Sequence, residues 1–293
     1  MRNKRNSTNL LVSRHSGFCF GVRRALRIAE DALKTHRRVF SLGPIIHNPQ
    51  VVNEFSKKGL ITAKNTRGIK NEKGVTVLVP SHGINPEVLK KKRFSYIDTT
   101  CPLVGRVQKI VKDLKRRGYF IIIVGNKKHP EVRGLSGIAG KNSLVLKDKF
   151  QAKAFNIRGP HALQRRRLAL IAQTTAAVSN FREILSEIAK KDFTELISFN
   201  TVCKNTTDRE NEARRLAQKA DAMIIIGGKQ SANTSKLADT CKKVNKFTYH
   251  IESKDDLNNV LLKRKKKIGI ATGASTPIYA INEVIEKIRG KVK

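Results

Sequence analysis

Three cysteines share a setting that suits metal or redox chemistry. Cys19, Cys101 and Cys203 each stand directly before a segment with helical character, and they lie 82 and 102 residues apart. A helix N-terminus favours the thiolate over the thiol, and nearby arginines or lysines add to this effect. The sequence therefore makes these three thiols candidates for metal ligands or for nucleophiles.

Three thiolates that meet at one point would fit two kinds of metal site. They could hold a zinc ion with one open position, or an iron–sulfur cluster in which one iron lacks a protein ligand. An open metal position is what a Lewis acid needs in order to bind a substrate. Spacing alone still favours three unrelated buried cysteines, so that interpretation stays open. The fourth cysteine, Cys241, lies within a probable helix, and we expect it to be a structural residue.

The elements that would position these thiols recur along the chain. Short apolar runs are each followed by a polar turn and then by a helix-like segment, as in VTVLVPSHG (75–83), YFIIIVGNKKHPE (119–131), LALIAQTT (168–175), AMIIIGGKQSANT (222–234) and IGIATGAST (268–276). Apolar runs that alternate with helical periods are typical of buried parallel strands in βα units. The sequence therefore predicts an α/β fold.

Polar side chains follow these predicted strands. Ligands of open α/β sheets bind at the carboxyl ends of the strands. The groups expected there are mostly imidazoles, hydroxyls and amides, which suit an anionic small molecule and particularly a phosphate. They are His47, Ser81-His82-Gly83, His129-Pro130-Glu131, Gln173-Thr174-Thr175, Ser231-Ala232-Asn233 and Ser275-Thr276. Taken singly, Glu131 would be interpreted as a solvated residue at a helix start.

The charge of the chain raises the question of its partners. The 293 residues include 60 lysines and arginines against 23 aspartates and glutamates, a formal net charge of +37. The basic residues are spread along the whole chain, no tryptophan is present, and no nucleic-acid-binding motif appears, so we expect no nucleic-acid partner. The charge would favour an acidic protein partner, although a generally basic proteome explains it as well.

Hydropathy indicates where the protein works. No apolar run approaches the length of a membrane span, and the basic N-terminus has too short an apolar stretch for a secretory signal. Widely spaced cysteines argue against a disulfide framework. We therefore expect a cytoplasmic protein with no membrane partner.

Nine short motifs, in order, resemble the LytB/IspH family of 4-hydroxy-3-methylbut-2-enyl diphosphate reductases. They are GFCFGVRRAL, HNPQVV, SHG, DTTCPLV, HPEVRG, QTT, NTVCKNTTDRE, GGKQSANTSKL and GASTP, between about residues 14 and 285. The resemblance implies three similar α/β domains with short, mainly parallel sheets, arranged as a trefoil around a central metal cluster. We expect these domains at 1–100, 101–199 and 200–293, each with one of the three cysteines and the last with a C-terminal helix.

The resemblance also implies an activity and its residues. The reaction is the reductive dehydroxylation of (E)-4-hydroxy-3-methylbut-2-enyl diphosphate, by two electrons, to isopentenyl and dimethylallyl diphosphate, the last step of the non-mevalonate isoprenoid pathway. Matching positions make Cys19, Cys101 and Cys203 the ligands of a 4Fe–4S cluster with one iron open to substrate. Glu131 matches the proton-delivering carboxylate and Thr174 its partner near the substrate hydroxyl. The residues that match diphosphate contacts are His47, His82, His129, Ser231, Asn233 and Ser275.

The chain departs from the family pattern at one position, and the reaction also needs an electron donor. Many members carry serine where this chain has Ala232, so only a backbone N–H could contact the diphosphate there. The chain lacks a GxGxxG nucleotide fingerprint, so the electrons must come from a donor, and the family implies a ferredoxin or flavodoxin. We expect a monomer or a weak homodimer.

Two functions from other classes stay as alternatives. Three cysteines and a water could form a zinc hydrolase that acts on a phosphorylated metabolite. The positive charge could instead serve a nucleic-acid binder without catalysis.

Overall fold

The protein folds around three four-stranded sheets in which every pair of neighbouring strands is parallel. The computed structural model describes residues 8–70, 72–85, 87–90, 95–156, 167–229, 231–260, 262 and 265–291. The predicted α/β class is confirmed. Gln230 of the GGKQSANT motif and the side chain of Ala232 lie outside the described part of the chain.

The first two sheets are each built from consecutive strands. The first sheet has the order β3-β2-β4-β5, with β2 (Arg38–Leu42), β3 (Leu60–Ala63), β4 (Val75–Val79) and β5 (Tyr96–Asp98). The second has the order β7-β6-β8-β9, with β6 (Phe120–Val124), β7 (Ser143–Leu146), β8 (Arg167–Ala172) and β9 (Glu195–Phe199). In both, the first strand along the chain is central, the second lies on one side of it, and the third and fourth follow on the other.

The third sheet repeats this order but takes its last strand from the other end of the chain. Its order is β11-β10-β12-β1, with β10 (Ala222–Ile226), β11 (Thr248–Ile251), β12 (Lys267–Thr272) and β1 (Asn9–Val12). The strand β1 lies beside β12 with Asn9 opposite Lys267 and Val12 opposite Ile270. Strand pairing therefore associates residues 9–12 with the C-terminal sheet rather than with the rest of 1–100. The boundaries expected near residues 100 and 199 stay predictions.

Two compact units divide the chain. The terminal unit comprises Met1–Arg23, Ile46–Phe55 and Lys204–Lys293 and contains the third sheet. The central unit comprises Arg24–Ile45 and Ser56–Cys203 and contains the first and second sheets. The chain therefore passes from one unit to the other within helix α1 (Phe20–Thr35) and within helix α2 (Pro49–Lys57).

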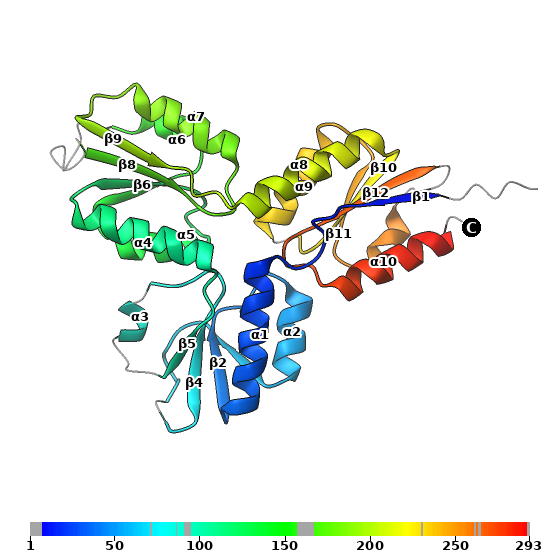
Figure 1. Ribbon diagram of the computed structural model, residues 1–293, viewed down its shortest axis with the longest axis horizontal. Coiled ribbons are helices and arrows are strands. Elements are labelled where there is room, and N and C mark those ends of the chain that lie inside the picture. The colour runs from blue at the N-terminus through cyan, green and yellow to red at the C-terminus, as the bar shows by residue number, and fades with distance from the viewer. Residues whose placement is uncertain are drawn as a thin grey trace, which may run out of the picture. The chain divides into compact units, whose positions relative to one another are not determined.

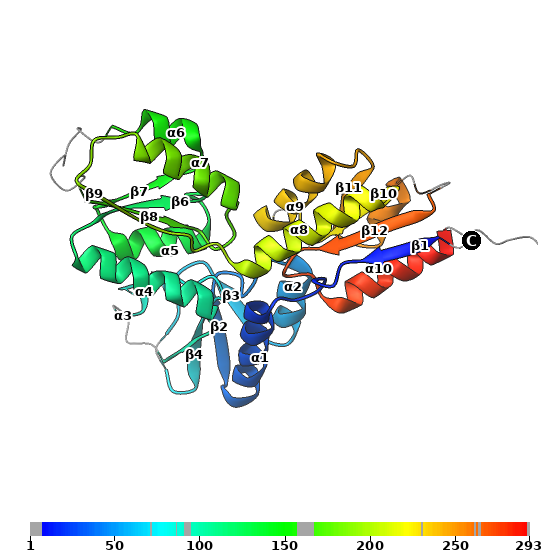
Figure 2. The ribbon, with the colours of Figure 1, turned by 45° about the horizontal axis from the view of Figure 1, so that its top comes forward.

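The second sheet is covered by helices on both faces. The two pairs of helices that cover it (Figures 1 and 2) are α4 (Pro102–Arg116) with α5 (Pro130–Ala139), and α6 (Lys149–Ala154) with α7 (Val178–Ala189). Ile121 and Ile123 pack against α4 and α5, whereas Ile122 and Val124 pack against α6 and α7. Successive side chains of a strand point to opposite faces, so burial on both faces explains the continuous apolar run that the sequence shows.

The third sheet has the same layering. Its two faces are covered by α8 (Lys204–Lys219) with α9 (Ala232–Lys242), and by α10 (Ile278–Lys291) with the short 3₁₀ helix η2 (Asp255–Asn259). Cys241 is fully buried among Ala213, Leu237 and Ala238 in the first of these layers. Burial, with the nearby Glu210 carboxylate, raises the pKa of its thiol to about 12. The prediction that Cys241 is structural is confirmed.

One further helix, the short α3 (Glu87–Lys90), lies between β4 and β5 along the chain. Among the described residues, none of the helices is both long enough and apolar enough to cross a membrane.

Candidate functional site

The residues predicted to bind substrate or to act on it all lie after the first or the third strand of a sheet, in the following loop or in the first turn of the helix that comes next. In each sheet these two strands are neighbours whose following chain segments diverge to opposite sides, so the crevice between their carboxyl ends is the place where open α/β sheets bind ligands. His47 and His82 follow β2 and β4; His129 with Glu131 and Thr174 follow β6 and β8; Ser231 with Ala232 and Asn233, and Ser275, follow β10 and β12.

Glu131 and Thr174 meet in the crevice of the second sheet. Helix α5 begins with Pro130, and the Nδ1 atom of its N-cap, His129, accepts the N–H of Glu131 at 3.2 Å. The Glu131 carboxyl accepts two hydrogen bonds from Thr174, one from its N–H at 2.7 Å and one from its Oγ1 at 2.8 Å. Glu131 is 2% exposed and Thr174 5%. The interpretation of Glu131 as a solvated helix-start residue is therefore wrong.

The environment of Glu131 favours its protonated form at neutral pH. Burial raises the pKa of this carboxyl to about 7, although the two hydrogen bonds from Thr174 act in the opposite direction. A proton donor works best when its pKa lies near the pH of the reaction. A buried carboxyl with such a pKa, in a crevice of this kind, has the properties of a general acid.

A glutamine holds the two loops of this crevice together. The side-chain oxygen of Gln173 accepts the N–H of Asn126 at 3.1 Å, and its Nε2 donates to Thr175 Oγ1 at 2.7 Å. Asn126 belongs to the loop after β6, whereas Gln173 and Thr175 belong to the loop after β8. Gln173 is thus a positioning residue for the Glu131–Thr174 pair.

Two predicted site histidines meet within the central unit. The rings of His82 and His129 lie edge to face with centroids 6.5 Å apart. His82 is 7% exposed and occupies the turn before Gly83, which has φ +71° and packs so closely that a Cβ there would lie 2.5 Å from Gln108 Nε2. The structure therefore brings His82, His129, Glu131 and Thr174 into one chain of contacts. Their catalytic and binding roles stay predictions.

A second set of predicted residues meets in the terminal unit. Ser275 Oγ donates to the carbonyl oxygen of His47 at 3.0 Å, and Asn48 Nδ2 donates to the carbonyl oxygen of Ser275 at 2.8 Å. The His47 side chain reaches the surface, yet enough protein surrounds it that desolvation lowers its pKa. Ser231 is the N-cap of α9, where its Oγ accepts the N–H of Thr234 at 3.4 Å. Asn233 is half-buried in the first turn of the same helix.

Cys101 and Cys203 are held by two turns of the same design. Each follows the last strand of its sheet, and its N–H donates at 2.8 Å to the carbonyl oxygen of the second residue after the third strand, Ser81 for Cys101 and Thr174 for Cys203. Both turns have the pattern Asx-Thr-x-Cys. In both, the Asx Oδ1 atom accepts the N–H two residues later, and the threonine hydroxyl donates to the last carbonyl of the third strand.

Cys19 reaches the equivalent point by a different route. Its N–H donates at 3.0 Å to the carbonyl oxygen of Ala274, again the second residue after the third strand of its sheet. Six residues, 13–18, separate it from β1, and the Asx-Thr-x-Cys pattern is absent from its turn. This shared anchoring was not predicted, although the repeated segments DTTC and NTVC are the sequence signal for it at Cys101 and Cys203.

The three thiols differ from Cys241 in a way that suits metal ligation. Cys19, Cys101 and Cys203 are half-buried and stand at the starts of α1, α4 and α8, whereas Cys241 is inaccessible in the core. Cys19 belongs to the terminal unit, and Cys101 and Cys203 belong to the central unit. Among the residues that the structure describes, no group of three or more His, Cys, Asp or Glu side chains is arranged to hold a metal ion.

Known proteins resemble this chain over nearly its whole length. The model of the LytB protein family matches residues 10–289. The 4-hydroxy-3-methylbut-2-enyl diphosphate reductase of Caldanaerobacter subterraneus subsp. tengcongensis is 41% identical over 285 residues, which cover 96% of each chain. The enzyme of the same name from Aquifex aeolicus is 40% identical over 291 residues, again 96% of each chain.

Two solved structures are similar as well. One is that of (E)-4-hydroxy-3-methyl-but-2-enyl diphosphate reductase, the terminal enzyme of the non-mevalonate pathway, with 39% identity, a TM-score of 0.70, and coverage of 97% of this chain and 99% of that chain. The other is the reductase from Plasmodium falciparum, with 28% identity, a TM-score of 0.85, and coverage of 96% and 87%. Nine motifs in order, one strand order used three times and these matches lead to one conclusion: the chain belongs to the LytB protein family.

Proposed function

We propose that this protein reduces (E)-4-hydroxy-3-methylbut-2-enyl diphosphate to isopentenyl and dimethylallyl diphosphate. Two electrons and two protons enter the reaction; the bond between carbon and the hydroxyl breaks, the hydroxyl leaves as water, and a new C–H bond forms. The observation that carries the proposal is the buried Glu131–Thr174 pair in the crevice of the second sheet, in a chain of the LytB family.

Glu131 is the proton donor for the leaving hydroxyl. Its pKa of about 7 leaves a large share of the carboxyl protonated at neutral pH, and the proton passes to the substrate directly or through Thr174 Oγ1. The two hydrogen bonds from Thr174 fix the carboxyl, so the proton is held at a defined place before the substrate arrives.

The diphosphate is bound by neutral donors. Imidazole, hydroxyl, amide and helix-end N–H groups all donate hydrogen bonds to phosphate oxygens. The residues assigned to this task are His47, His82, His129, Thr174, Ser231, Asn233 and Ser275, with the backbone N–H of Ala232. Four of these positions lie at helix starts, where the helix dipole favours an anion: His129 on α5, and Ser231, Ala232 and Asn233 on α9.

Cys19, Cys101 and Cys203 would hold a 4Fe–4S cluster with one iron open to substrate. The family consists of iron–sulfur enzymes, and the donor set fits, because thiolates at helix starts are stabilised by the dipole and half-buried thiols stay accessible. When bound, such a cluster supplies the two electrons in single steps and a Lewis acid for the oxygen of the substrate.

The proposal also covers the electron donor, the location, the oligomeric state and the domains of the enzyme. The electrons come from a small acidic protein of the ferredoxin or flavodoxin class, whose encounter with a chain of net charge +37 is favoured electrostatically. We place the enzyme in the cytoplasm as a monomer or weak homodimer, with three α/β domains over 1–100, 101–199 and 200–293.

Purification without air tests the proposal. The protein should be brown, should contain close to four irons and four sulfides per chain, and should consume the allylic diphosphate when dithionite and a viologen supply electrons. Serine in place of Cys19, Cys101 or Cys203 should lower the iron content and abolish turnover, whereas Cys241→Ser should retain both. A colourless protein that contains zinc and releases inorganic phosphate would contradict the proposal and favour the hydrolase.

A further inference from the structure

We infer that Arg209 and Glu212, on one face of α8, are positioning residues that hold the loop 13–18 in the conformation that presents Cys19. The inference rests on the proposed function in one respect, the assignment of Cys19 as a cluster ligand. The helix that carries both residues starts directly after Cys203, and all the contacts described below lie within the terminal unit.

The loop before Cys19 needs support from outside itself. Its six residues are longer than the connections that lead to Cys101 and Cys203, and Gly17 has φ +91°, a conformation that side chains with a Cβ rarely adopt. A long loop opens more easily than a tight turn, because fewer of its backbone groups are bonded locally. The structure supplies the missing partners from α8 and from the end of β12.

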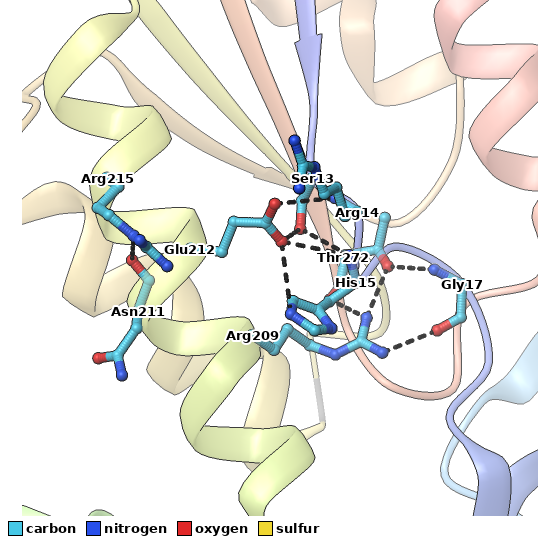
Figure 3. Close-up of polar contacts among 9 residues, drawn as sticks. All are labelled: Ser13, Arg14, His15, Gly17, Arg209, Asn211, Glu212, Arg215 and Thr272. Atoms are coloured by element: carbon cyan, nitrogen blue, oxygen red, sulfur yellow. Dashed lines mark hydrogen bonds and ion pairs between the residues drawn. The ribbon is translucent and has the colours of Figure 1, made fainter.

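Glu212 binds the first half of the loop (Figure 3). Its carboxylate accepts three hydrogen bonds, from Ser13 Oγ at 2.6 Å, from the N–H of Arg14 at 3.0 Å and from the N–H of His15 at 3.2 Å. Burial alone would raise the pKa of Glu212, but the hydrogen bonds outweigh burial and the pKa is lowered. Glu212 is therefore ionised at neutral pH, and each of these hydrogen bonds is charge-assisted.

Arg209 binds the second half of the loop and joins it to the end of β12. Its guanidinium donates to the carbonyl oxygen of Gly17 at 3.1 Å and to that of Thr272 at 3.0 Å (Figure 3). The same group approaches Thr272 Oγ1 at 3.2 Å and the carbonyl oxygen of Gly273 at 3.4 Å. Arg209 is 2% exposed. The fork of donors on an arginine allows one side chain to tie two chain segments together.

Thr272 completes the connection. Its Oγ1 accepts the N–H of Gly17 at 3.0 Å and a hydrogen bond from Arg209, and it donates to the carbonyl oxygen of Gly273 at 3.1 Å. A hydroxyl has one donor and two acceptor sites, so all of its capacity is used. Gly17 is thus attached to the last residue of β12, and the bond from the Cys19 N–H to Ala274 attaches Cys19 to the loop that follows this strand.

Together with the carbonyl oxygens of Ile270 and Ser13, which accept the N–H groups of Ser13 and Ser16, these contacts give every backbone N–H from Ser13 to Gly17, and that of Cys19, an acceptor. Two charged side chains of one helix thus do for Cys19 what the Asx and threonine side chains of the local turn do for Cys101 and Cys203. Burying a charged group is costly, so a buried arginine bonded to loop carbonyls is better explained by the need for one loop conformation than by stability alone.

The test measures thiol reactivity in the cluster-free protein. Apoprotein of the full chain is exposed to iodoacetamide, and mass spectrometry follows the alkylation of each cysteine, with Cys101 and Cys203 as internal references. Arg209→Gln and Glu212→Gln should raise the alkylation rate of Cys19 about tenfold or more relative to the references, because charge-assisted hydrogen bonds of the closed loop are lost. Hydrogen exchange over residues 13–19 should accelerate in parallel.

A matched variant on the same helix separates positioning from helix stability. Arg215 is exposed on α8, and Arg215→Gln should leave the reactivity of all the cysteines unchanged. Should Arg209→Gln fail to fold, Thr272→Val removes the bridging hydroxyl and should expose Cys19 less strongly, while Thr272→Ser should restore the wild-type rate. Equal acceleration of the three thiols, or none, would overturn the inference.

Reconstitution with iron and sulfide keeps this inference distinct from the proposed function. If Cys19 is a ligand that the two residues position, Arg209→Gln lowers iron retention and alters the electron paramagnetic resonance spectrum of the reduced cluster, and Arg209→Lys restores part of both. If instead Cys19→Ser retains the full iron content, the ligand assignment fails, whereas the alkylation result still decides whether α8 positions the loop.

Discussion

The second and third sheets have the same strand order but carry different chemistry at equivalent positions. The N-cap after the first strand is His129 in one and Ser231 in the other, and two residues later the chain has Glu131 in one and Asn233 in the other. The position two residues after the third strand holds Thr174 in one and Ala274 in the other. The backbone frame therefore repeats, while an acid with its hydroxyl partner occurs only in the second sheet of these two.

The two sheets also differ in how they hold their cysteines. Cys203 is fixed by Asn200 and Thr201, its own near neighbours in the chain, whereas the loop of Cys19 is fixed by Arg209 and Glu212 from a distant helix. The same anchoring point is thus reached by local turn chemistry in one repeat and by tertiary contacts in the other. This difference means that Cys203 and Cys19 should respond to different substitutions.

The largest expected difference between the two sheets concerns proton delivery. Glu131→Gln keeps the size and a hydrogen-bonding side chain but removes the proton donor, so kcat should fall about 10²- to 10⁴-fold in the assay with dithionite and viologen. Glu183→Gln, on the exposed face of α7, is the control and should leave kcat unchanged. A Glu131→Gln enzyme with wild-type kcat would show that the acid is not the donor.

A smaller effect follows from the pH dependence of folding. The pKa of Glu131 is about 7 in the folded protein against 4.5 in the unfolded chain, so the stability linked to its proton is fully present below pH 4.5 and is lost as the pH rises through 7. The loss should be about 3 kcal/mol. Urea unfolding between pH 4 and 8 measures it, and the slope of the unfolding free energy against pH should shrink in Glu131→Gln, because an amide, like Asn233 at the equivalent position of the third sheet, does not titrate. An unchanged slope would contradict the raised pKa.

In the second and third sheets, the glycine that directly follows the first strand should not tolerate replacement by a residue with a Cβ. A Cβ on Gly125 would lie 2.8 Å from Gln173 Oε1, and one on Gly227, where φ is +148°, would lie 2.9 Å from Thr276 Oγ1. Gly125→Ala and Gly227→Ala should each lower the free energy of unfolding by about 1–3 kcal/mol. Gly105→Ala, inside α4 with open space around it, should instead raise it by about 0.5–1 kcal/mol. Urea unfolding of the three variants, with opposite signs expected, checks the assignment.

Effects of similar size, which differ between the sheets only in rank, concern the two local cysteine turns. Thr201 Oγ1 donates to the carbonyl oxygen of Ala172 and also accepts the N–H of Ala172, whereas Thr99 Oγ1 donates to the carbonyl of Val79, which the Thr99 N–H also reaches. Thr201→Val leaves a backbone N–H without its acceptor and should cost about 1–3 kcal/mol, against about 1 kcal/mol for Thr99→Val. Urea unfolding should rank them in this order, and the reverse order would mean that the two turns are not held as described.

Much of the fold was predictable from the sequence because local patterns determine it. Apolar runs flanked by turn residues predicted the parallel strands, and the segments after Cys19, Cys101 and Cys203 were expected to be helical, which the structure has as α1, α4 and α8. Residues that follow strands lie at one edge of a sheet, so the positions of His129, Glu131 and Thr174 could be predicted as well. The burial of Cys241 followed from its place inside a helix.

Tertiary structure decided the rest. The four residues of β1 could pair with any open strand edge, and only the packed third sheet determines that they join β12. Glu131 is two residues into a helix, where side chains are commonly solvated; its high pKa depends on burial beside Thr174, 43 residues away. The loop before Cys19 depends on Arg209, which is 192 residues from Gly17. Burial and long-range hydrogen bonds exist only once distant segments are packed, so no local pattern in the sequence can contain them.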